Sequence, residues 1–251
     1  AAEIASYISP GAALVEFGSG ASVKTRLILD AAPQTAVYVP VDISEDALAV
    51  AASAINADYP NLTVAPLAGD FTDDLELPEA ARGRPRTGFF PGSTIGNFEH
   101  AETVAFLCAA GRLLHSGAQF VVGVDLVKEP AVLIRAYDDA QGVTAAFNKN
   151  LLARINRELD GDFDLTAFAH EAVWNPNKSR VEMHLKSLKD QTAHAGGHTF
   201  RFAEGETIHT ENSHKFTPEG FSRLAEEAGW RTLKLWTSPA PAFAVFMLAA
   251  D

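Results

Sequence analysis

The sequence predicts an α/β fold in which a mostly parallel sheet carries helices on both faces. Through the first half of the chain, short apolar runs alternate with helical patterns, which is typical of parallel strands joined by helices. The first apolar run ends in an acid and two glycines, Glu16 to Gly20, and the second ends in Asp42. Glycines at such a turn let the backbone approach a ligand, and an acid after the second strand suits ribose hydroxyls.

Composition limits the classes of protein that fit. The 251 residues suffice for one domain, or for one domain with a large insertion. The net charge of −12 and the lack of a basic run argue against a nucleic-acid partner. The one cysteine, Cys108, excludes an internal disulfide and suits a reducing compartment. No apolar stretch approaches the length of a membrane span, so we expect a cytoplasmic protein.

The elements of the first half follow in order. Strands are expected at residues 12–17, 37–42, 62–67, 86–90 and 118–125. Helices are expected between them, at residues 22–32, 44–57 and 99–115. The second helix begins at Ser44, where Glu45 and Asp46 lie near the positive end of the helix dipole.

The pattern changes after Asp125. Residues 130–159 are expected to form two helices, and alternation at 168–174, 180–188 and 198–202 predicts antiparallel strands with one exposed face. A helix near 217–228 and strands at 230–236 and 242–249 then close the chain with an antiparallel hairpin. We therefore expect an inserted α+β subdomain at 130–210, within a domain formed by residues 1–129 and 211–251.

The glycine motif admits three interpretations. A dinucleotide site requires a third glycine where Val23 stands, and a P-loop requires a glycine directly before Lys24 and Thr25, where Val23 also stands. The pattern acid-x-G-x-G fits the first motif of class I S-adenosylmethionine (SAM) methyltransferases, whose cofactor carries no phosphate. A plain strand-to-helix turn is the remaining alternative, and Asp42 disfavours it.

Three further segments carry polar side chains of interest. After the fourth expected strand, Gly92 and Gly96 permit close backbone approach, and Asn97 offers a hydrogen-bond donor and acceptors. The alternative for Asn97 is a helix N-cap. Tyr137 and Glu211 stand in polar segments near the ends of the expected insertion, where each on its own is an ordinary surface residue.

Together these segments resemble the histidine-specific, SAM-dependent methyltransferases, which trimethylate the α-amine of L-histidine to hercynine in ergothioneine biosynthesis. The most specific matches are the runs at 90–97, 125–148 and 210–216. The resemblance covers essentially the whole chain and implies a class I methyltransferase fold. It also implies that SAM is the cofactor and that a small amino acid is the substrate.

The resemblance also implies site residues. Those placed around SAM are Gly18, Gly20, Lys24, Asp42, Asp70 and Phe71. Asp42 would bind the ribose hydroxyls, and Asp70 and Phe71 would frame the adenine.

The substrate residues implied by the resemblance fall into two groups. Gly92, Asn97 and Tyr137 would fix the amino-acid end of histidine, and Asn97 and Tyr137 would serve catalysis by positioning, with no general base assigned. Glu211 and Ser213 would bind the imidazole. Met183 would line that pocket or else be an ordinary core methionine. No metal is implied, because the eight histidines show no convincing ligand spacing.

The sequence departs from the family at its start. Only Ala1 to Gly11 precede the first strand, whereas the family carries a longer segment with a tyrosine that closes over the site. Tyr7 lacks the matching context. We therefore expect a monomeric histidine Nα-methyltransferase or its core. The alternatives are a relative acting on another amino acid such as a tryptophan derivative, or a SAM-binding module without catalysis. A nucleotide-dependent oxidoreductase comes last because of Val23.

Overall fold

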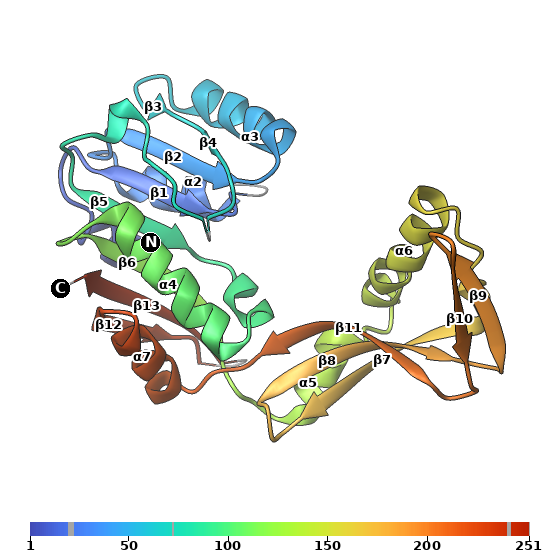
Figure 1. Cartoon of the computed structure of the whole chain (residues 1–251). Helices are drawn as coiled ribbons and strands as arrows, with labels where there is room; N and C mark the ends of the chain where they lie inside the picture. Colours follow the sequence, from blue (N-terminus) through green and yellow to red (C-terminus); the bar gives the residue numbers. More distant parts are fainter. Residues whose placement is uncertain (20–22, 72, 240–241, 251) are drawn as a thin grey trace. The chain divides into compact units, whose positions relative to one another are not determined.

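The chain divides into two compact units. The computed structural model describes residues 1–19, 23–71, 73–239 and 242–250 (Figure 1). The first unit comprises Ala1–Leu126 with Phe216–Asp251, and the second comprises Val127–Lys215. The expected boundary at residue 210 falls inside strand β11 (Thr207–His214), which pairs with β8 (Arg180–Ser187) as far as His214. That ladder holds residues 211–214 in the second unit.

The first unit is built on an eight-stranded sheet in the order β12-β13-β6-β5-β1-β2-β3, with β4 also paired to β2. Its strands are β1 (Ala13–Phe17), β2 (Val37–Asp42), β3 (Thr63–Val64), β4 (Leu67–Ala68), β5 (Arg86–Phe90), β6 (Gln119–Asp125), β12 (Trp230–Thr237) and β13 (Phe243–Ala250). The central strands pair in parallel, whereas β13 runs antiparallel to both β6 and β12. This confirms the expected fold class, including the closing hairpin.

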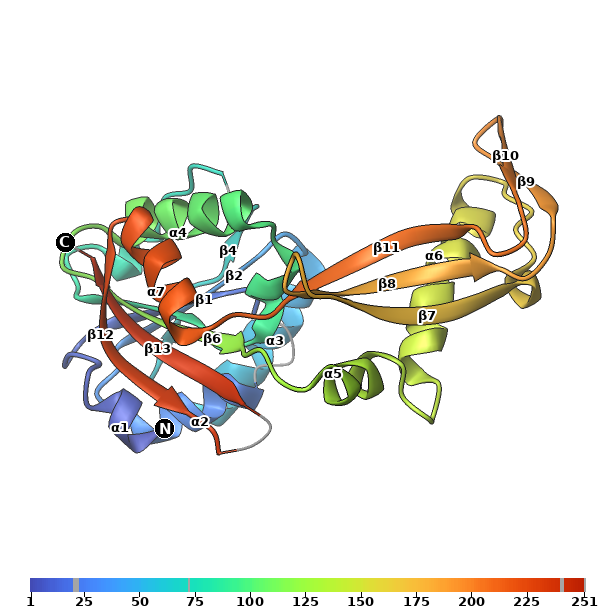
Figure 2. The same cartoon turned by 90° about the horizontal axis from the view of Figure 1, so that it is seen from below.

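Helices cover both faces of this sheet. Helices α4 (His100–Leu114) and α7 (Pro218–Glu227) pack on one face, and α1 (Ala2–Ala5), α2 (Val23–Ala31) and α3 (Glu45–Asp58) pack on the other (Figure 2). Side chains of β1 alternate between the faces, with Val15 and Phe17 on the α4 side and Leu14 on the α2 side. No helix in the described residues is long and apolar enough to cross a membrane.

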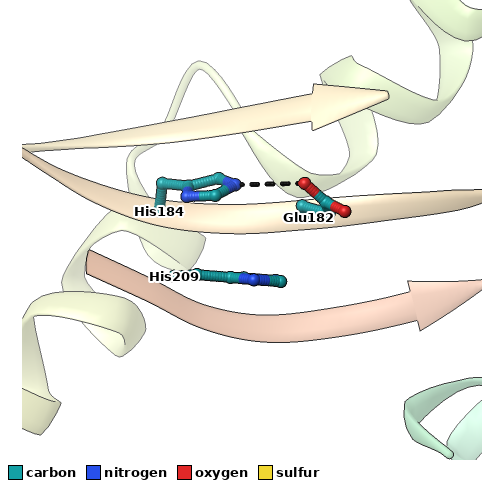
Figure 3. A group of neighbouring side chains, drawn as sticks. All are labelled: Glu182, His184 and His209. Atoms are coloured by element: carbon teal, nitrogen blue, oxygen red, sulfur yellow. Dashed lines mark hydrogen bonds and ion pairs between the residues drawn. The ribbon is translucent and has the colours of Figure 1, made fainter. Parts of the chain in front are cut away.

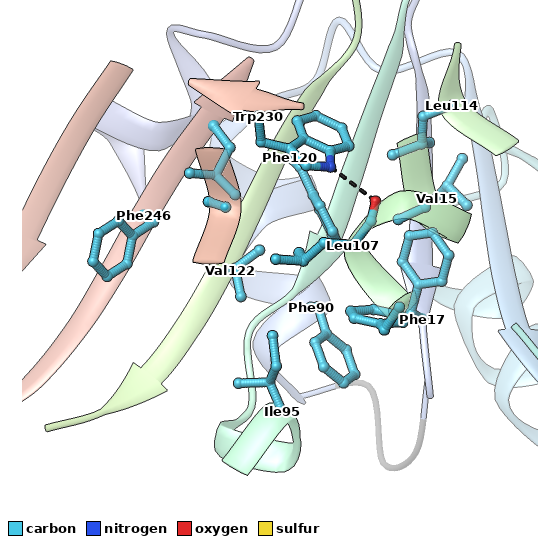
Figure 4. Packing of buried hydrophobic residues seen from close by; sticks show 14 of the residues in the cluster. Val15, Phe17, Phe90, Ile95, Leu107, Leu114, Phe120, Val122, Trp230 and Phe246 are labelled. Carbon is cyan, nitrogen blue, oxygen red and sulfur yellow. Dashed lines mark hydrogen bonds between the residues drawn. The ribbon is translucent and has the colours of Figure 1, made fainter. Parts of the chain in front are cut away.

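The core on the α4 side is aromatic. Phe17, Phe90 and Phe120 are buried beneath α4, and Trp230 donates its indole N–H to the backbone oxygen of Leu107 at 2.8 Å (Figure 4). Burying a large aromatic side chain stabilises the fold by about 1.5–3 kcal/mol. The indole bond satisfies the one polar group that this burial removes from water.

The third expected strand, at 62–67, is interrupted. The structure has two short strands there, β3 and β4, which pair with opposite ends of β2. The carbonyls of Tyr38 and Asp42 accept N–H groups from Ala65 and Gly69, so even-numbered residues of β2 face this edge. Pro40 faces it too and has no N–H to donate. The ladder therefore lacks a donor at its middle, between β3 and β4.

The second unit contains a three-stranded antiparallel sheet in the order β11-β8-β7, where β7 is Phe168–Asn175, and a hairpin of β9 (Gln191–Ala195) and β10 (His198–Phe202). Helices α5 (Pro130–Tyr137) and α6 (Val143–Glu158) complete it. Leu152 of α6 packs with Phe168 and Leu185 of the sheet. Short 3₁₀ turns occur in both units, η1 (Glu79–Ala81), η2 (Ser93–Asn97) and η3 (Leu165–Ala167).

Strands β9 and β11 were not expected from the sequence. Seven of the eight residues of β11 are polar, and Ile208 is its one large apolar residue. It therefore lacks the apolar alternation by which strands are recognised. The backbone ladder to β8 holds this polar segment in a strand.

Candidate functional site

In the first unit, the acid of the glycine motif lies inside the protein. Glu16 is 4% exposed, and its Oε2 accepts hydrogen bonds from Thr25 Oγ1 of α2 at 2.6 Å and from the Tyr38 hydroxyl at 2.5 Å. Burial raises the pKa of Glu16 to about 7, although both hydrogen bonds and the charge of Lys24 oppose this rise. Glu16 thus ties β1, β2 and α2 together beneath the glycine turn, a role that the sequence did not assign.

The turn after β1 begins at Gly18, whose φ of +67° is strained for any residue with a Cβ. Its N–H donates to the backbone oxygen of Val41 at 2.8 Å, which fixes the turn beside the end of β2. Lys24 lies at the start of α2 with an exposed side chain. Gly20, also predicted to contact SAM, lies outside the described residues.

Asp42 stands at the end of β2, as expected. Its Oδ1 accepts the Ser44 N–H at 3.1 Å, and Ser44 Oγ in turn accepts the Ala47 N–H at the start of α3. The carboxylate is therefore held by the helix start. Ile43, between Asp42 and Ser44, is 72% exposed. An apolar surface beside a fixed carboxylate matches the two sides of a nucleoside. Ile43 could not be predicted from the sequence, because a single exposed isoleucine carries no pattern.

The two residues predicted to frame the adenine follow β4. Asp70 is exposed, and Phe71 is half-buried with ring-edge contacts to Phe17, Phe90 and Phe106. Phe71 is therefore anchored in the core by one edge, and the rest of its ring remains at the surface.

The segment after β5 forms the 3₁₀ turn η2, with Gly92 before its first residue and Asn97 as its last. Asn97 is exposed, and the N-cap of α4 is Glu99, which forms a capping box with Glu102. The alternative of Asn97 as helix cap is therefore wrong. A Cβ on Gly123 of β6 would lie 2.2 Å from the Pro91 oxygen, so the approach of this segment to β6 requires glycine.

In the second unit, the predicted substrate residues lie on one face of the sheet. Met183 of β8 pairs directly with Glu211 of β11, and Ser213 follows two residues later on the same face. Met183 is buried, while Glu211 is half-buried and its pKa is raised by burial. The fourth residue, Tyr137 of α5, reaches this face through its hydroxyl, which lies 2.7 Å from Ser213 Oγ.

A lysine completes this group. Lys215 is 2% exposed, and its Nζ donates to the Tyr137 hydroxyl at 2.7 Å and to Ser213 Oγ at 2.8 Å. We call Tyr137, Ser213 and Lys215 the hydroxyl–lysine cluster. Lys215 has no role among the residues implied by the sequence, although its spacing of two from Ser213 places both on one face of an extended segment.

Tyr137 is also held through its backbone. His170 of β7 lies with Nε2 2.7 Å from the Tyr137 oxygen and with Nδ1 2.9 Å from Asn148 Nδ2. Because the amide nitrogen of Asn148 can only donate, His170 Nδ1 accepts and Nε2–H donates to Tyr137. The same amide also donates to the His184 oxygen at 3.2 Å. Asn148 and His170 thus lock the end of α5 to the sheet.

The predicted site residues are divided between the units. Described residues of the first unit are Gly18, Lys24, Asp42, Asp70, Phe71, Gly92 and Asn97, and those of the second are Tyr137, Met183, Glu211 and Ser213. The second unit also has an apolar cavity of about 830 Å³. Its lining includes Leu151, Leu152, Ile155, Phe163, Phe202 and Ile208. None of the predicted site residues that the structure describes lines this cavity.

A parallel sheet with a glycine turn after β1, an acid after β2 and a closing antiparallel hairpin defines a class I SAM-dependent methyltransferase. A SAM-dependent methyltransferase from Clostridium acetobutylicum ATCC 824 shares the fold with a TM-score of 0.53 over 96% of this chain and 85% of that one, at 11% identity. Residues 1–250 match the family described as histidine-specific methyltransferase, SAM-dependent. The chain belongs to this family, and SAM is its cofactor.

Curated relatives agree with this assignment. The histidine N-alpha-methyltransferase of Mycolicibacterium smegmatis (strain ATCC 700084 / mc(2)155) is 43% identical over 92% of this chain and 73% of its own length. The protein of the same name from Mycobacterium tuberculosis (strain CDC 1551 / Oshkosh) is 41% identical over 94% of this chain and 74% of its own.

More distant relatives carry other names. Ergothioneine biosynthesis protein 1 of Neurospora crassa is 27% identical over 94% of this chain and 27% of its own length. A 4-dimethylallyltryptophan N-methyltransferase of Aspergillus fumigatus is 29% identical over 95% of this chain and 75% of its own.

Proposed function

We propose that this chain transfers three methyl groups from SAM to the α-amine of L-histidine, giving hercynine for ergothioneine biosynthesis. Family membership and the two relatives above 40% identity support the reaction class. The choice of histidine as substrate rests on one face of the β11-β8-β7 sheet. Glu211 lies on this face together with the hydroxyl–lysine cluster.

This face offers what a neutral imidazole requires. Lys215 donates to both hydroxyls of the cluster, and one hydroxyl donates to the other. One hydroxyl hydrogen is then left to donate to a ligand. The Glu211 carboxylate accepts, and it lies two strand residues from Ser213, roughly 7 Å away. An imidazole has one nitrogen that accepts and one N–H that donates, so it complements this pair.

Burial sharpens the preference for a polar ring. Glu211 is half-buried and Met183 beside it is buried. A site with buried hydrogen-bonding groups rejects ligands that cannot pair with them, by roughly 10⁴ or more in favourable cases. Met183 would pack against the flat face of the ring.

In the first unit, we propose that Gly18, Lys24, Asp42, Asp70 and Phe71 hold SAM, with Asp42 on the ribose hydroxyls and Ile43 against the base. We include Gly20 in this cofactor site on the sequence motif alone, because it lies outside the described residues. SAM supplies a methyl group on a sulfonium centre, which a neutral amine displaces in line. Asp42 is already oriented by Ser44, so little side-chain entropy is lost when it binds the ribose.

Catalysis in this proposal is by positioning. Gly92, Asn97 and Tyr137 would bind the amino-acid end of histidine and orient its nitrogen, and Asn97 and Tyr137 thereby act as the catalytic residues. Holding reactants in near-attack geometry contributes as much as about 7–11 kcal/mol in well-oriented systems. The amine loses a proton before each methyl transfer, and we assign no general base.

We also propose that the protein acts in the cytoplasm as a monomer and binds no nucleic acid. The net charge of −12 supports the last point, because phosphate backbones would be repelled. Sedimentation velocity at micromolar concentration, with and without a DNA duplex, measures the oligomeric state and the binding of nucleic acid.

The function is tested by incubating the chain with SAM and each common amino acid, or 4-dimethylallyltryptophan, and recording product masses. Histidine gaining three methyl groups is the expected result. Methylation of another amino acid in place of histidine would select a relative with different specificity. SAM binding by calorimetry without turnover on any substrate would select a binding module.

Two substitutions test the residue assignments against each other. Glu211→Ala should weaken histidine binding by about 1.5–3 kcal/mol, roughly tenfold or more, because it removes a charged hydrogen-bond acceptor. It should leave SAM affinity unchanged. Asp42→Ala should do the reverse, weakening SAM binding only. Calorimetry with each ligand measures both constants, and unchanged histidine affinity in Glu211→Ala would remove that residue from the site.

A further inference from the structure

The other face of the β11-β8-β7 sheet carries a separate group of side chains. Glu182 and His184 lie two residues apart on β8, so both point to the face opposite Met183 and Glu211. His209 of β11 is the direct cross-strand partner of His184. Figure 3 shows the three side chains together, with the two imidazole rings one above the other. We call them the Glu–His–His group.

The geometry of this group brings three ligand atoms together. One ligand atom from each residue lies within 4.8 Å of the others. His184 Nε2 is 3.4 Å from Glu182 Oε2, and the two imidazole rings are stacked with centroids 4.7 Å apart. A metal with bonds of about 2.0–2.2 Å to such ligands brings the ligand atoms to roughly 3–3.5 Å from one another. Side-chain rotations that shorten these separations by roughly 1–2 Å would close the site on a metal.

Neighbouring side chains orient Glu182. Arg180 Nε donates to Glu182 Oε1 at 2.8 Å and Asn175 Nδ2 donates to the same oxygen at 2.9 Å, while Oε2 is the oxygen nearest His184. The carboxylate is thus oriented, with Oε1 held by two donors and Oε2 turned toward the histidines.

His209 is oriented in a similar way. Its Nε2 lies 2.7 Å from Asn212 Oδ1 on the same strand. With Nε2–H donating to that oxygen, the second ring nitrogen carries the lone pair. A histidine ligand in a metal site commonly donates its other N–H to a carbonyl or carboxylate oxygen, which fixes the ring and its tautomer.

We propose that Glu182, His184 and His209 form a binding site for a divalent transition metal of the zinc class. Two imidazole nitrogens and one carboxylate oxygen are a donor set that Zn²⁺ accepts, with a water as fourth ligand. The site lies on the sheet face opposite the proposed substrate residues. It therefore goes beyond the proposed methyl transfer and does not depend on it.

A metal bound at this site would hold strands β8 and β11 together. The β8–β11 ladder is irregular between His209 and Glu211, and a bulge of this kind weakens pairing locally. A metal bound by His184 and His209 would join the two strands at the residue before that irregularity. We expect the metal to stabilise the second unit against unfolding, because it binds the native state and not the unfolded one.

The experiment uses the full chain without a purification tag, stripped with chelator. Zn²⁺ is titrated in competition with a chromophoric chelator, and Co²⁺ is added separately to record its visible d–d absorption. We expect one equivalent of tightly bound Zn²⁺, a Co²⁺ spectrum of low coordination number, and a higher melting temperature with metal. The titration is repeated with Cys108→Ser, because the thiol is another zinc ligand in the chain.

His209→Ala is the decisive variant, because His209 is exposed and its loss should leave the fold intact. Changes to groups outside the ligand shell already cost 10–100-fold in affinity, so loss of a ligand should cost at least about 100-fold. His198→Ala, an exposed histidine on β10, is the matched control and should bind zinc normally. Circular dichroism of the metal-free variants checks their folding.

Three results would overturn the proposal. These are zinc binding by the wild type that is no tighter than by His209→Ala, equal losses of zinc affinity in His209→Ala and His198→Ala, or zinc binding that disappears with Cys108→Ser.

Glu182→Gln supplies a second variant, which should weaken zinc binding while retaining side-chain volume. Its melting temperature should no longer rise on addition of Zn²⁺.

Discussion

At the scale of single residues, Glu16 shows how one buried acid organises the cofactor end of the sheet. Its carboxyl group is inside the first unit, bonded to Thr25 and Tyr38, and desolvation raises its pKa from 4.5 to about 7. The folded state therefore binds a proton that the unfolded chain has already lost between pH 4.5 and 7. Proton binding of this kind makes stability depend on pH.

We predict that Glu16→Gln removes part of this pH dependence. Because the folded pKa is raised, the contribution of Glu16 to stability is fully present below pH 4.5 and is lost as pH rises through 7. A shift from 4.5 to about 7 corresponds to about 3 kcal/mol. Urea unfolding at pH 5, 6, 7 and 8 should show the wild type losing stability relative to Glu16→Gln.

Other titrating groups contribute equally to both proteins, so the difference between the two curves isolates Glu16. The neutral glutamine keeps the side-chain volume, and its amide oxygen has two lone pairs with which it can accept both hydrogen bonds. Parallel stability curves for the two proteins across this range would show that Glu16 is ionised in the fold throughout. The hydrogen bonds would then be stronger than the desolvation they oppose.

Single residues also show what the sequence could predict. Gly18, Asp42 and Ser44 stand at strand ends and a helix start as expected, since positive φ and capping are local properties. Lys215 and Ile43 were missed for a different reason. The role of Lys215 in the site depends on its hydrogen bond to Tyr137, 78 residues earlier in the chain. That contact exists only after the second unit has folded.

At the scale of elements, periodicity identified most strands and helices, but it missed β9 and β11 and did not predict the break between β3 and β4. Strand β11 is held by backbone pairing to β8 rather than by an apolar face. Strands β3 and β4 are separated where Pro40 of β2 has no N–H to donate to this edge. Tertiary pairing decides both cases, and a pattern within one segment does not record it.

The packing of η2 against β6 leads to a prediction at this scale. Gly123→Ala would place a Cβ 2.2 Å from the Pro91 oxygen, so the segment carrying Gly92 and Asn97 must move. We expect the free energy of unfolding to fall by about 1–3 kcal/mol, and methyl transfer to slow because proposed substrate residues are displaced. Chemical denaturation and turnover with histidine measure the two effects.

Gly111→Ala is the control for this prediction. Gly111 lies inside α4, and a Cβ there would meet Trp230 at 3.7 Å, an ordinary contact distance. Alanine is favoured over glycine in a helix by about 1 kcal/mol, so this variant should be as stable as the wild type or slightly more stable. If Gly123→Ala is equally stable and active, the position of η2 does not depend on that glycine.

At the scale of the whole molecule, the second unit is an insertion with neighbouring ends. The N–H of Phe216 donates to the Asp125 oxygen at 3.0 Å, and Leu126 bridges to Phe216. Each unit also has its own buried apolar clusters. A chain that leaves and re-enters a sheet at adjacent points can lose the intervening segment without breaking the ladder on either side.

We therefore predict that residues 127–215 can be replaced by a Gly-Ser linker of about eight residues, which spans roughly 15 Å. The shortened chain should fold cooperatively and bind SAM within about tenfold of the full chain, a difference of about 1.4 kcal/mol. It should not methylate histidine, because Tyr137, Met183, Glu211 and Ser213 are gone. Circular dichroism, calorimetry with SAM and product mass measure these three properties. Asp42→Ala in the shortened chain should abolish the remaining SAM binding, whereas a folded shortened chain without SAM affinity would mean that the second unit contributes to the cofactor site.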